Sequence, residues 1–156
     1  MTVIVSIDPG KTGAIACVVD GRPVIVEDMP VIGKHVSPIL LHQLISDMGP
    51  DAIVLEQVGS SPQMGVTSAF NFGQNYGVIL GVCANWPVTL VRPQVWKKHH
   101  RIPPRSDKEV SRALALRLYP HLAERLERKK DDGRAEACLI GQWLHDTQHN
   151  NQEDTQ

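Results

Sequence analysis

Four acidic residues occupy positions at which a folded chain can hold their carboxylates rigidly. Asp8 and Glu56 each end a short run of mostly β-branched and aliphatic residues, which is typical of a buried strand. Asp132 and Glu136 lie four residues apart in a segment of helical character, so their side chains share one face of that helix. Carboxylates brought together repel each other unless a cation lies between them, and Mg²⁺ prefers oxygen ligands. The four acids therefore indicate a divalent-metal site.

Each acid also has an ordinary structural interpretation. Asp8 begins the sequence Asp-Pro-Gly, which is common in turns. Asp131 and Asp132 suit the first turn of a helix, where acids offset the helix dipole, although this role explains Glu136 less well. A phosphate-binding Walker loop is excluded, because Val5 occupies the position of its first glycine.

The elements that must position these acids begin with three strands. After the first strand, residues 14–19 and 23–27 are predicted to form two more. They are separated by Asp20 and Gly21, a strong two-residue signal for a hairpin. The first three strands should therefore form an antiparallel meander.

The next two elements bring Asp8 and Glu56 together. A helix is expected over residues 38–48, with Ser37 as its N-cap, and it leads into the strand at residues 52–56. A strand, a crossover helix and a strand imply parallel pairing with the first strand. The two acids should then lie side by side at neighbouring strand ends.

A long helix is expected over residues 64–84. Gly73, Gly77 and Gly81 recur in it every four residues, although each glycine costs about 1 kcal/mol relative to alanine in a helix interior. We expect that the glycines allow another part of the protein to approach the helix closely. That part is either the sheet of the same chain or a partner helix in a dimer.

The later elements are a short strand at residues 88–91 and two helices. Ser106 and Glu109 form a capping box for a helix that runs to about residue 119. Its apolar positions Val110, Ala113, Leu114 and Leu118 are expected to face the core. The last helix, within residues 128–144, carries the second pair of acids.

The net charge of −1 conceals a strong segregation of charge along the chain. Residues 1–91 carry three Lys or Arg against seven Asp or Glu, residues 92–130 carry twelve against four, and residues 131–156 carry one against six. A block of +8 beside acidic segments indicates a polyanionic partner held against an acidic centre, unless it is only a solvated helical face.

The prolines of residues 92–105 predict a partly extended loop that offers basic side chains to DNA phosphates. Trp96 suits burial better than stacking on a base. His99 and His100 lack the spacing of metal ligands. They are expected to be a solvated pair, with contact to phosphate as the second alternative. The residues assigned to DNA contacts are Lys11, Lys97, Lys98, Arg101, Arg105 and Lys108.

Length and composition fit one α/β domain over residues 1–146, followed by a disordered polar tail over residues 147–156. No apolar run is long enough to span a membrane, and the N-terminus lacks a secretory signal, so a cytoplasmic location is expected. The three cysteines lie in apolar contexts and are expected to be buried free thiols.

The order of these features resembles the RuvC-type Holliday-junction resolvases of the RNase H-like superfamily. Four motifs carry the resemblance: Ile-Asp-Pro-Gly at 7–10, Leu-Glu-Gln-Val at 55–58, Phe-Gly-Gln followed by Gly within 72–77, and Lys-Asp-Asp-Gly-Arg-Ala-Glu-Ala at 130–137. Each is weak alone, but their order and spacing over residues 2–145 are specific. The last motif is more similar to the phage-encoded branch than to the cellular bacterial one.

The resemblance implies an RNase H-like mixed five-stranded sheet flanked by helices, and a homodimer that uses the long helix. It also implies nicking of Holliday junctions or other branched DNA with two Mg²⁺ ions, or Mn²⁺ in their place. Asp8, Glu56, Asp132 and Glu136 match the catalytic acids of the family, and Lys108 matches a basic residue near the scissile phosphate.

Two departures from the family pattern leave alternatives open. The last two acids are four rather than three residues apart, so the third ligand is supplied by Asp131, by Asp132 or by both. The loop after Glu56 lacks the aromatic residue that wedges junctions open in cellular members, with Gln63 or Met64 as candidates in its place. An RNase H, a flap or fork nuclease, or a non-catalytic module that binds branched DNA remain alternatives.

Overall fold

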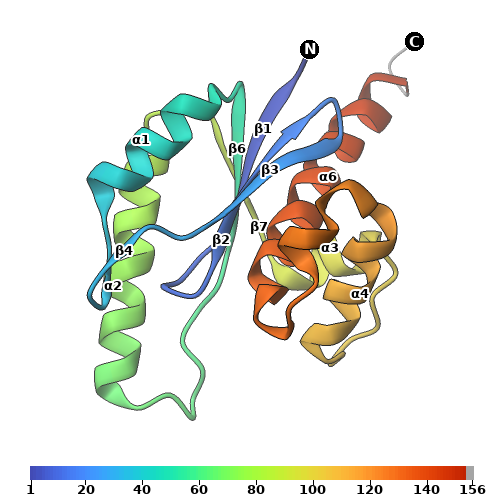
Figure 1. The fold of residues 1–156 in the computed structure, drawn as a ribbon. Helices are drawn as coiled ribbons and strands as arrows, with labels where there is room; N and C mark the ends of the chain where they lie inside the picture. Colours follow the sequence, from blue (N-terminus) through green and yellow to red (C-terminus); the bar gives the residue numbers. More distant parts are fainter. Residues whose placement is uncertain (154–156) are drawn as a thin grey trace.

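A five-stranded mixed sheet forms the centre of the fold in a computed structural model that describes residues 1–153 (Figure 1). Its spatial order is β3-β2-β1-β6-β7, with the first three strands antiparallel and with β6 and β7 parallel to β1. The strands are β1 (Val3–Asp8), β2 (Ala14–Val19), β3 (Arg22–Asp28), β6 (Ala52–Glu56) and β7 (Val88–Val91). The predicted mixed sheet is confirmed.

Local sequence signals account for the connections. Asp20 and Gly21 both have positive φ, 46° and 79°, as the two-residue hairpin between β2 and β3 requires. The Ser37 side chain caps helix α1 (Pro38–Met48) by accepting a hydrogen bond from the backbone NH of Leu40. These predictions are also confirmed.

Helices cover both faces of the sheet (Figure 1). On one face lie α1 and α2 (Val66–Cys83), and on the other lie α3 (Pro93–His99), α4 (Lys108–Leu118) and α6 (Asp132–Glu153). Short elements complete the described chain: β4 (Val31–Ile32), β5 (His35–Val36), η1 (Pro120–Leu122), α5 (Ala123–Leu126) and η2 (Lys129–Asp131).

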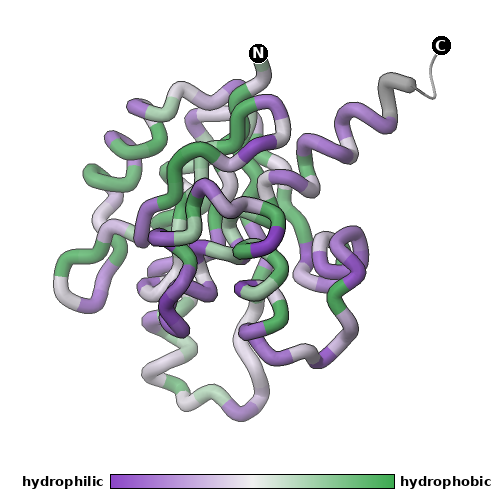
Figure 2. Tube along the Cα trace, turned by 45° about the vertical axis from the view of Figure 1, so that its right-hand side comes forward, coloured by the Kyte–Doolittle hydropathy of each residue, from purple (hydrophilic) through white to green (hydrophobic). Residues whose placement is uncertain are grey.

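Two hydrophobic cores follow from this arrangement, because successive side chains of a strand point to opposite faces. Ile4 of β1 packs into the core beneath α3, α4 and α6, whereas Val5 and Ile7 pack beneath α1 and α2. Figure 2 shows the result as hydrophobic residues along the central strands and hydrophilic ones along the distal part of α6. The strand that carries Asp8 is therefore packed against helices on both of its faces.

Helix α6 lies close to the sheet. This close packing fixes the position of Asp132 and Glu136, which α6 carries, relative to the strand ends. The Ser6 hydroxyl donates a hydrogen bond of 2.6 Å to the carbonyl oxygen of Ala137. A Cβ atom on Gly141 would lie only 2.6 Å from Ser6 Oγ and 2.5 Å from Val18 Cγ2. Glycine is needed at residue 141 for α6 to lie this close to β1 and β2.

Three expectations about the helices are wrong. Residues 93–99 of the basic segment form α3 rather than a loop, because Pro93 stands at the start of the helix, where a missing NH costs little. The N-cap of α4 is Asp107 rather than Ser106, whose hydroxyl instead bonds to the Pro103 carbonyl. Helix α6 continues through residues 147–153, which were expected to be disordered. The rest of that expected tail, residues 154–156, lies outside the described residues.

The predicted core face of α4 is correct for Leu114, which packs against the core, but wrong for the other three residues. Val110 and Leu118 are 39% and 42% exposed, and Ala113 is exposed as well. Ser111 and Ala115 are buried instead, with Leu114 partly buried beside them. Helix α4 packs on α6, and the small side chains of Ser111 and Ala115 suit a close approach of the two helices.

Candidate active site

All four predicted acids line one cleft of about 850 Å³ at the carboxyl ends of β1 and β6. Ile7 pairs with Leu55 in the parallel ladder, so Asp8 and Glu56, the next residue of each strand, are neighbours. Asp132 and Glu136 reach the same cleft from the first turns of α6. Two strands and one late helix thus bring the four acids to one cleft, as predicted.

Asp8 lies where the first turn of α6 meets the sheet. A Cβ atom on Gly133 would lie 3.1 Å from Asp8 Oδ2 and 3.0 Å from the Thr12 carbonyl oxygen, so glycine allows this close approach. Burial raises the pKa of Asp8 well above its usual range, and the charges of Glu136 and Glu56 raise it further. Such a carboxylate gains stability from any cation that enters the cleft.

Glu56 is buried, with 5% of its surface exposed, and Trp96 holds its side chain. The Trp96 indole Nε1 donates a hydrogen bond of 2.8 Å to Glu56 Oε1. Burial raises the pKa of Glu56, and the Trp96 hydrogen bond limits the shift. The sequence prediction that Trp96 is buried is correct, but its link to Glu56 was missed. A buried indole NH requires an acceptor, and that was the only available signal.

Two lysine side chains pair with the acids of α6. Lys108 Nζ lies 3.0 Å from Asp132 Oδ2, and this hydrogen bond raises the lysine pKa. Lys97 Nζ lies 3.9 Å from Glu136 Oε1. Burial raises the pKa of Glu136, Lys97 opposes that shift, and Glu56 adds to it. The ammonium groups thus supply part of the positive charge that the acids require.

Asp131 has different surroundings from Asp132. Its carboxylate accepts hydrogen bonds from the Arg128 backbone NH and guanidinium, and Arg134 Nη1 lies 3.6 Å from its Oδ1. Burial alone would raise the pKa of Asp131, but these hydrogen bonds outweigh it, and the pKa lies below its usual range. Asp131 is therefore tied into the fold, whereas Asp132 interacts with Asp8 and Lys108.

No family model and no curated protein sequence matches the chain. Solved structures do match. RuvC of Thermus thermophilus superposes with a TM-score of 0.70 at 17% identity, covering 96% of this chain and 97% of that one. The same protein in complex with a Holliday junction gives 0.67 at 16% identity, covering 96% of each chain. The fowlpox virus Holliday junction resolvase gives 0.60 at 15% identity, covering 94% and 99%.

The chain has the RuvC fold. This confirms the RNase H-like architecture expected from the sequence. The match extends over nearly the whole described chain, so the sheet and the flanking helices correspond as one unit.

Within this RuvC fold, the cleft offers a suitable set of donors for divalent cations, namely four carboxylates with few hydrogen bonds of their own. In the described residues, however, no three Asp, Glu, His or Cys side chains converge closely enough to hold one ion. Two of the four acids are paired with lysines instead, Asp132 with Lys108 and Glu136 with Lys97. Carboxylate oxygens are nevertheless the donors that hard divalent cations prefer, so the residue types of the cleft fit such an ion.

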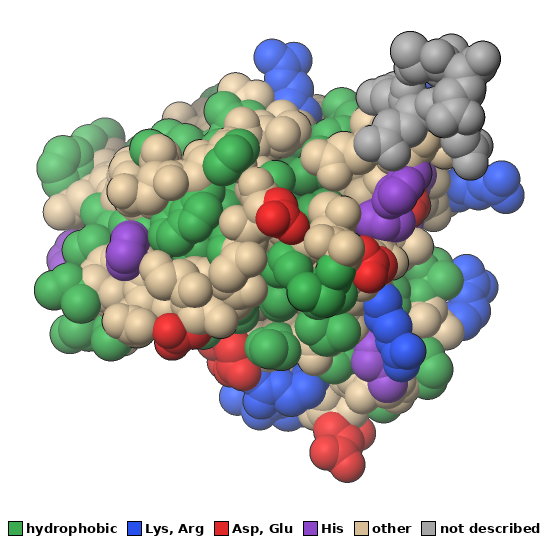
Figure 3. Space-filling view, turned by 90° about the horizontal axis from the view of Figure 1, so that it is seen from above, with side chains coloured by type: hydrophobic (Ala, Val, Ile, Leu, Met, Phe, Trp, Pro, Cys, Tyr) green, Lys and Arg blue, Asp and Glu red, His purple; other side chains and the backbone are tan. Residues whose placement is uncertain are grey.

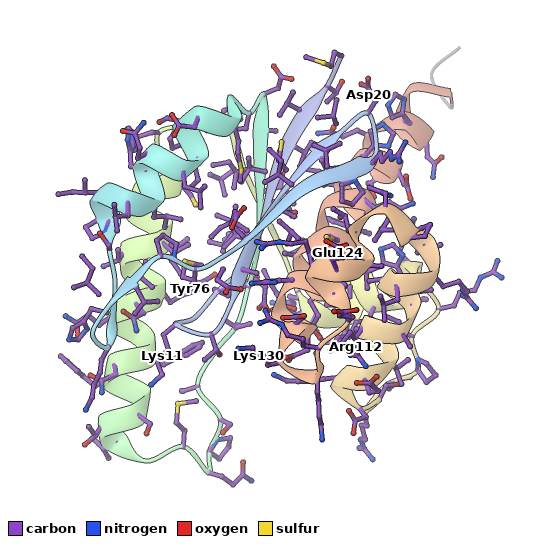
Figure 4. The ribbon with its side chains drawn as sticks, viewed as in Figure 1. Lys11, Asp20, Tyr76, Arg112, Glu124 and Lys130 are labelled. Atoms are coloured by element: carbon purple, nitrogen blue, oxygen red, sulfur yellow. The ribbon has the colours of Figure 1, made fainter. Side chains whose placement is uncertain are left out.

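The predicted DNA-contacting residues divide between two neighbouring surfaces. Lys11, Lys97 and Lys108 line the acidic cleft, whereas Lys98, Arg101 and Arg105 line a groove beside it, which Lys97 also borders. Arg128 and Lys130 also line the cleft, and the sequence analysis did not single them out. Figure 4 shows Lys11 and Lys130, from distant parts of the chain, near the same end of the sheet.

The opposite end of the molecule differs in character. Figure 3 shows the face from which β1 starts, where charged side chains are dispersed among apolar and neutral ones. None of the helices within residues 1–153 is both long enough and apolar enough to cross a membrane.

The prediction of a solvated histidine pair is wrong for His100, which is partly buried, whereas His99 is exposed. His99 Nε2 lies 2.8 Å from Asp146 Oδ2, and His100 Nε2 lies 2.7 Å from the Leu139 carbonyl oxygen. Burial lowers the pKa of His100. Both rings attach α3 to α6, and in this way they help to keep Trp96 and Lys97 beside the acids.

Proposed function

We propose that the protein is a divalent-metal-dependent endonuclease that nicks Holliday junctions or other branched DNA. One observation carries this proposal: four acids from two strands and one helix line a single cleft that four lysines and one arginine also line. A cleft with this combination attracts a phosphodiester while offering ligands for the cations that hydrolyse it. The likeness in fold to RuvC bound to a Holliday junction substrate, and to a fowlpox virus Holliday junction resolvase, supports the branched substrate.

Asp8, Glu56, Asp132 and Glu136 would hold two Mg²⁺ ions, or Mn²⁺ in their place. Two such ions, when bound, supply an activated water and stabilise the leaving 3′ oxygen of the phosphodiester. We assign Asp132 rather than Asp131 to this set, because Asp131 is already paired with Arg128 and Arg134. Trp96 keeps the Glu56 carboxylate oriented toward the cleft.

Lys108 is proposed to exchange partners during the reaction. Its ammonium pairs with Asp132, and 75% of its side chain surface is exposed. If Asp132 serves as a metal ligand, the Lys108 ammonium would be available to pair with the phosphate on which negative charge develops. Lys97 is paired with Glu136 in a similar way, and we propose the same exchange of partners for it.

The test uses labelled four-way, three-way, flap, duplex and RNA–DNA substrates, each with millimolar Mg²⁺ or EDTA. We expect nicking of the branched DNA in Mg²⁺ and none in EDTA. Asp8→Asn is the matched inactive control, because it preserves the size of the side chain while removing its charge. Equal nicking in EDTA would refute the two-metal mechanism, and preference for the RNA–DNA hybrid would indicate an RNase H.

We further propose a homodimer formed through α2. In the free chain, a Cβ atom on Gly73, Gly77 or Gly81 would meet nothing within 4 Å, so packing on the sheet does not require these glycines. Val66 and Phe70, on the same face of α2, are 88% and 72% exposed. A partner helix would cover this face, and two active sites would suit two symmetric cuts.

A further inference from the structure

A second groove, of about 760 Å³, lies beside the acidic cleft. Helix α3 and the segment that follows it form the groove, and Pro93, Ile102, Pro103 and Pro104 give it an apolar lining. We call it the proline groove. Its volume falls within the range of pockets that bind small organic groups. Its apolar residues have no part in the proposed catalytic step.

The backbone of the proline groove is firmly held. The Ile102 NH donates a hydrogen bond of 2.9 Å to the Lys97 carbonyl oxygen, and the Arg101 NH donates one of 3.0 Å to that of Lys98. Arg101 and Arg105 adopt left-handed conformations, with φ of 58° and 60°. Residues other than glycine rarely adopt this conformation unless their surroundings impose it, and such residues cluster at ligand-binding sites. The groove is therefore formed before any ligand arrives.

The charged residues of the groove are all basic. Lys97, Lys98, Arg101 and Arg105 line it, and no acidic residue in the described chain does so. An apolar surface surrounded by cations matches the two parts of a nucleotide, because a base is flat and poorly hydrated on its faces whereas its phosphates are anionic.

The proline groove is also continuous with the proposed active site. Pro93 and Lys97 line both the groove and the acidic cleft, and Lys97 Nζ lies 3.9 Å from Glu136 Oε1. A strand whose phosphate reaches the acids would pass Lys97 and continue along the groove. This continuity favours nucleic acid over an acidic peptide as the ligand.

We propose that the proline groove binds one unpaired base of the DNA strand that is cut, close to the scissile phosphate. The inference rests on the proposed function and narrows its substrate to junctions that can unstack a nucleotide at the cleavage position. Unstacking is least costly where pairing is already disrupted, as it is at a branch point. Only DNA that can release a base into the groove, such as a junction at its branch point, would then place its phosphate over the acids.

The test is fluorescence of 2-aminopurine, placed in turn at each position around the branch point of a four-way junction and measured with Ca²⁺ to allow binding. This base brightens when it leaves the stack. We expect wild-type protein to alter the signal strongly at one position beside the cleavage site. Pro104→Asp, which puts a negative charge on the groove lining, should abolish that change and weaken junction binding about tenfold.

Two further variants keep the result interpretable. Pro120→Asp makes the same substitution at an exposed proline that follows the C-terminal end of α4 and does not line the groove, and it should behave as wild type. Arg101→Gly removes a basic side chain at a position where φ is 58°, so it should fold well and still reduce the 2-aminopurine signal. Melting temperatures of all variants identify any that fail to fold.

An abasic nucleotide at the responsive position provides the decisive comparison. If the groove holds that base, the abasic site and Pro104→Asp should each slow nicking in Mg²⁺, and together they should slow it no more than either alone. Additive effects, or equal fluorescence changes at every position, would overturn the proposal. Position-specific fluorescence without nicking of any DNA would instead refute the proposed nuclease function and leave the groove as a base-binding site.

Discussion

Trp96 Nε1 of helix α3 donates a hydrogen bond of 2.8 Å to Glu56 Oε1 at the end of strand β6. This bond joins the basic segment to the acidic cluster, because the next residue, Lys97, lies beside Glu136. A side chain fully buried in the core thus carries its one polar atom to a proposed metal ligand. DNA contacts on α3 and metal ligation at Glu56 should consequently depend on each other.

Trp96→Phe tests this link, because it preserves most of the ring and removes only the donor. Glu56 would lose its hydrogen bond in a buried position, which should lower the free energy of unfolding by about 1–3 kcal/mol. The pKa of Glu56 should rise further, since the Trp96 hydrogen bond now lowers it, and nicking at neutral pH should require more Mg²⁺. Thermal melting and a Mg²⁺ titration of the nicking rate measure the two effects. Trp143→Phe, in the same hydrophobic core, is the control and should leave the Mg²⁺ requirement unchanged.

The stabilisation that Mg²⁺ confers should depend on pH. Asp8, Glu56 and Glu136 have pKa values raised in the folded protein, so the metal-free fold retains protons that the unfolded chain releases. Their contribution to stability is present at low pH and is lost as pH rises through the folded pKa values. Mg²⁺ must displace these protons, so it should raise the melting temperature more at pH 7.5 than at pH 5.5. If Mg²⁺ raised the melting temperature equally at pH 5.5 and pH 7.5, these acids would not be the metal ligands.

Asp131→Asn and Asp132→Asn should have opposite consequences. Asp131 is 2% exposed and pairs with two arginines, so loss of its charge should cost about 1–3 kcal/mol of stability. Asp132 is more exposed, and its substitution should lower nicking by orders of magnitude with little effect on melting in EDTA. Melting curves and nicking assays on both variants separate the roles. Near-normal nicking by Asp132→Asn would exclude it as a ligand.

Gly77→Leu tests the dimer. The side chain would project into open space in the single chain, and leucine favours helix, so the folded monomer should be as stable as wild type or more so. Against a closely packed partner helix, the same side chain should separate the two protomers. Sedimentation at micromolar concentration should therefore show dimers for wild type and monomers for the variant. A wild-type monomer, with and without junction DNA, would contradict the proposed interface.

Much of the sheet was predictable because its signals are local. Each strand is a short apolar run closed by turn residues, and the Asp20–Gly21 hairpin and the Ser37 cap depend only on neighbouring residues. A crossover between two such strands leaves only one common handedness. These rules were sufficient to place Asp8 beside Glu56, about fifty residues apart in the chain.

The errors arose where tertiary contacts override local preference. The sequence of α4 offers an apolar stripe that includes Val110 and Leu118, yet close packing on α6 selects Ser111 and Ala115 for the interface. The polar residues after Thr147 continue a helix that their composition does not favour. An existing helix can extend at little cost, since each added residue makes one more hydrogen bond without a new nucleus.

By itself, the sequence determined which residues carry the charge: the four acids, the basic segment and the strands and helices that bear them. Only the tertiary structure decided how those charges are paired. Arg134, fixed by Asp28, reaches Asp131 and so leaves Asp132 to Lys108, while Trp96 rather than a lysine bonds to Glu56. The reason is physical: a carboxylate pairs with the donor that the fold brings within about 3 Å, and that distance depends on how α3, α4 and α6 pack on the sheet.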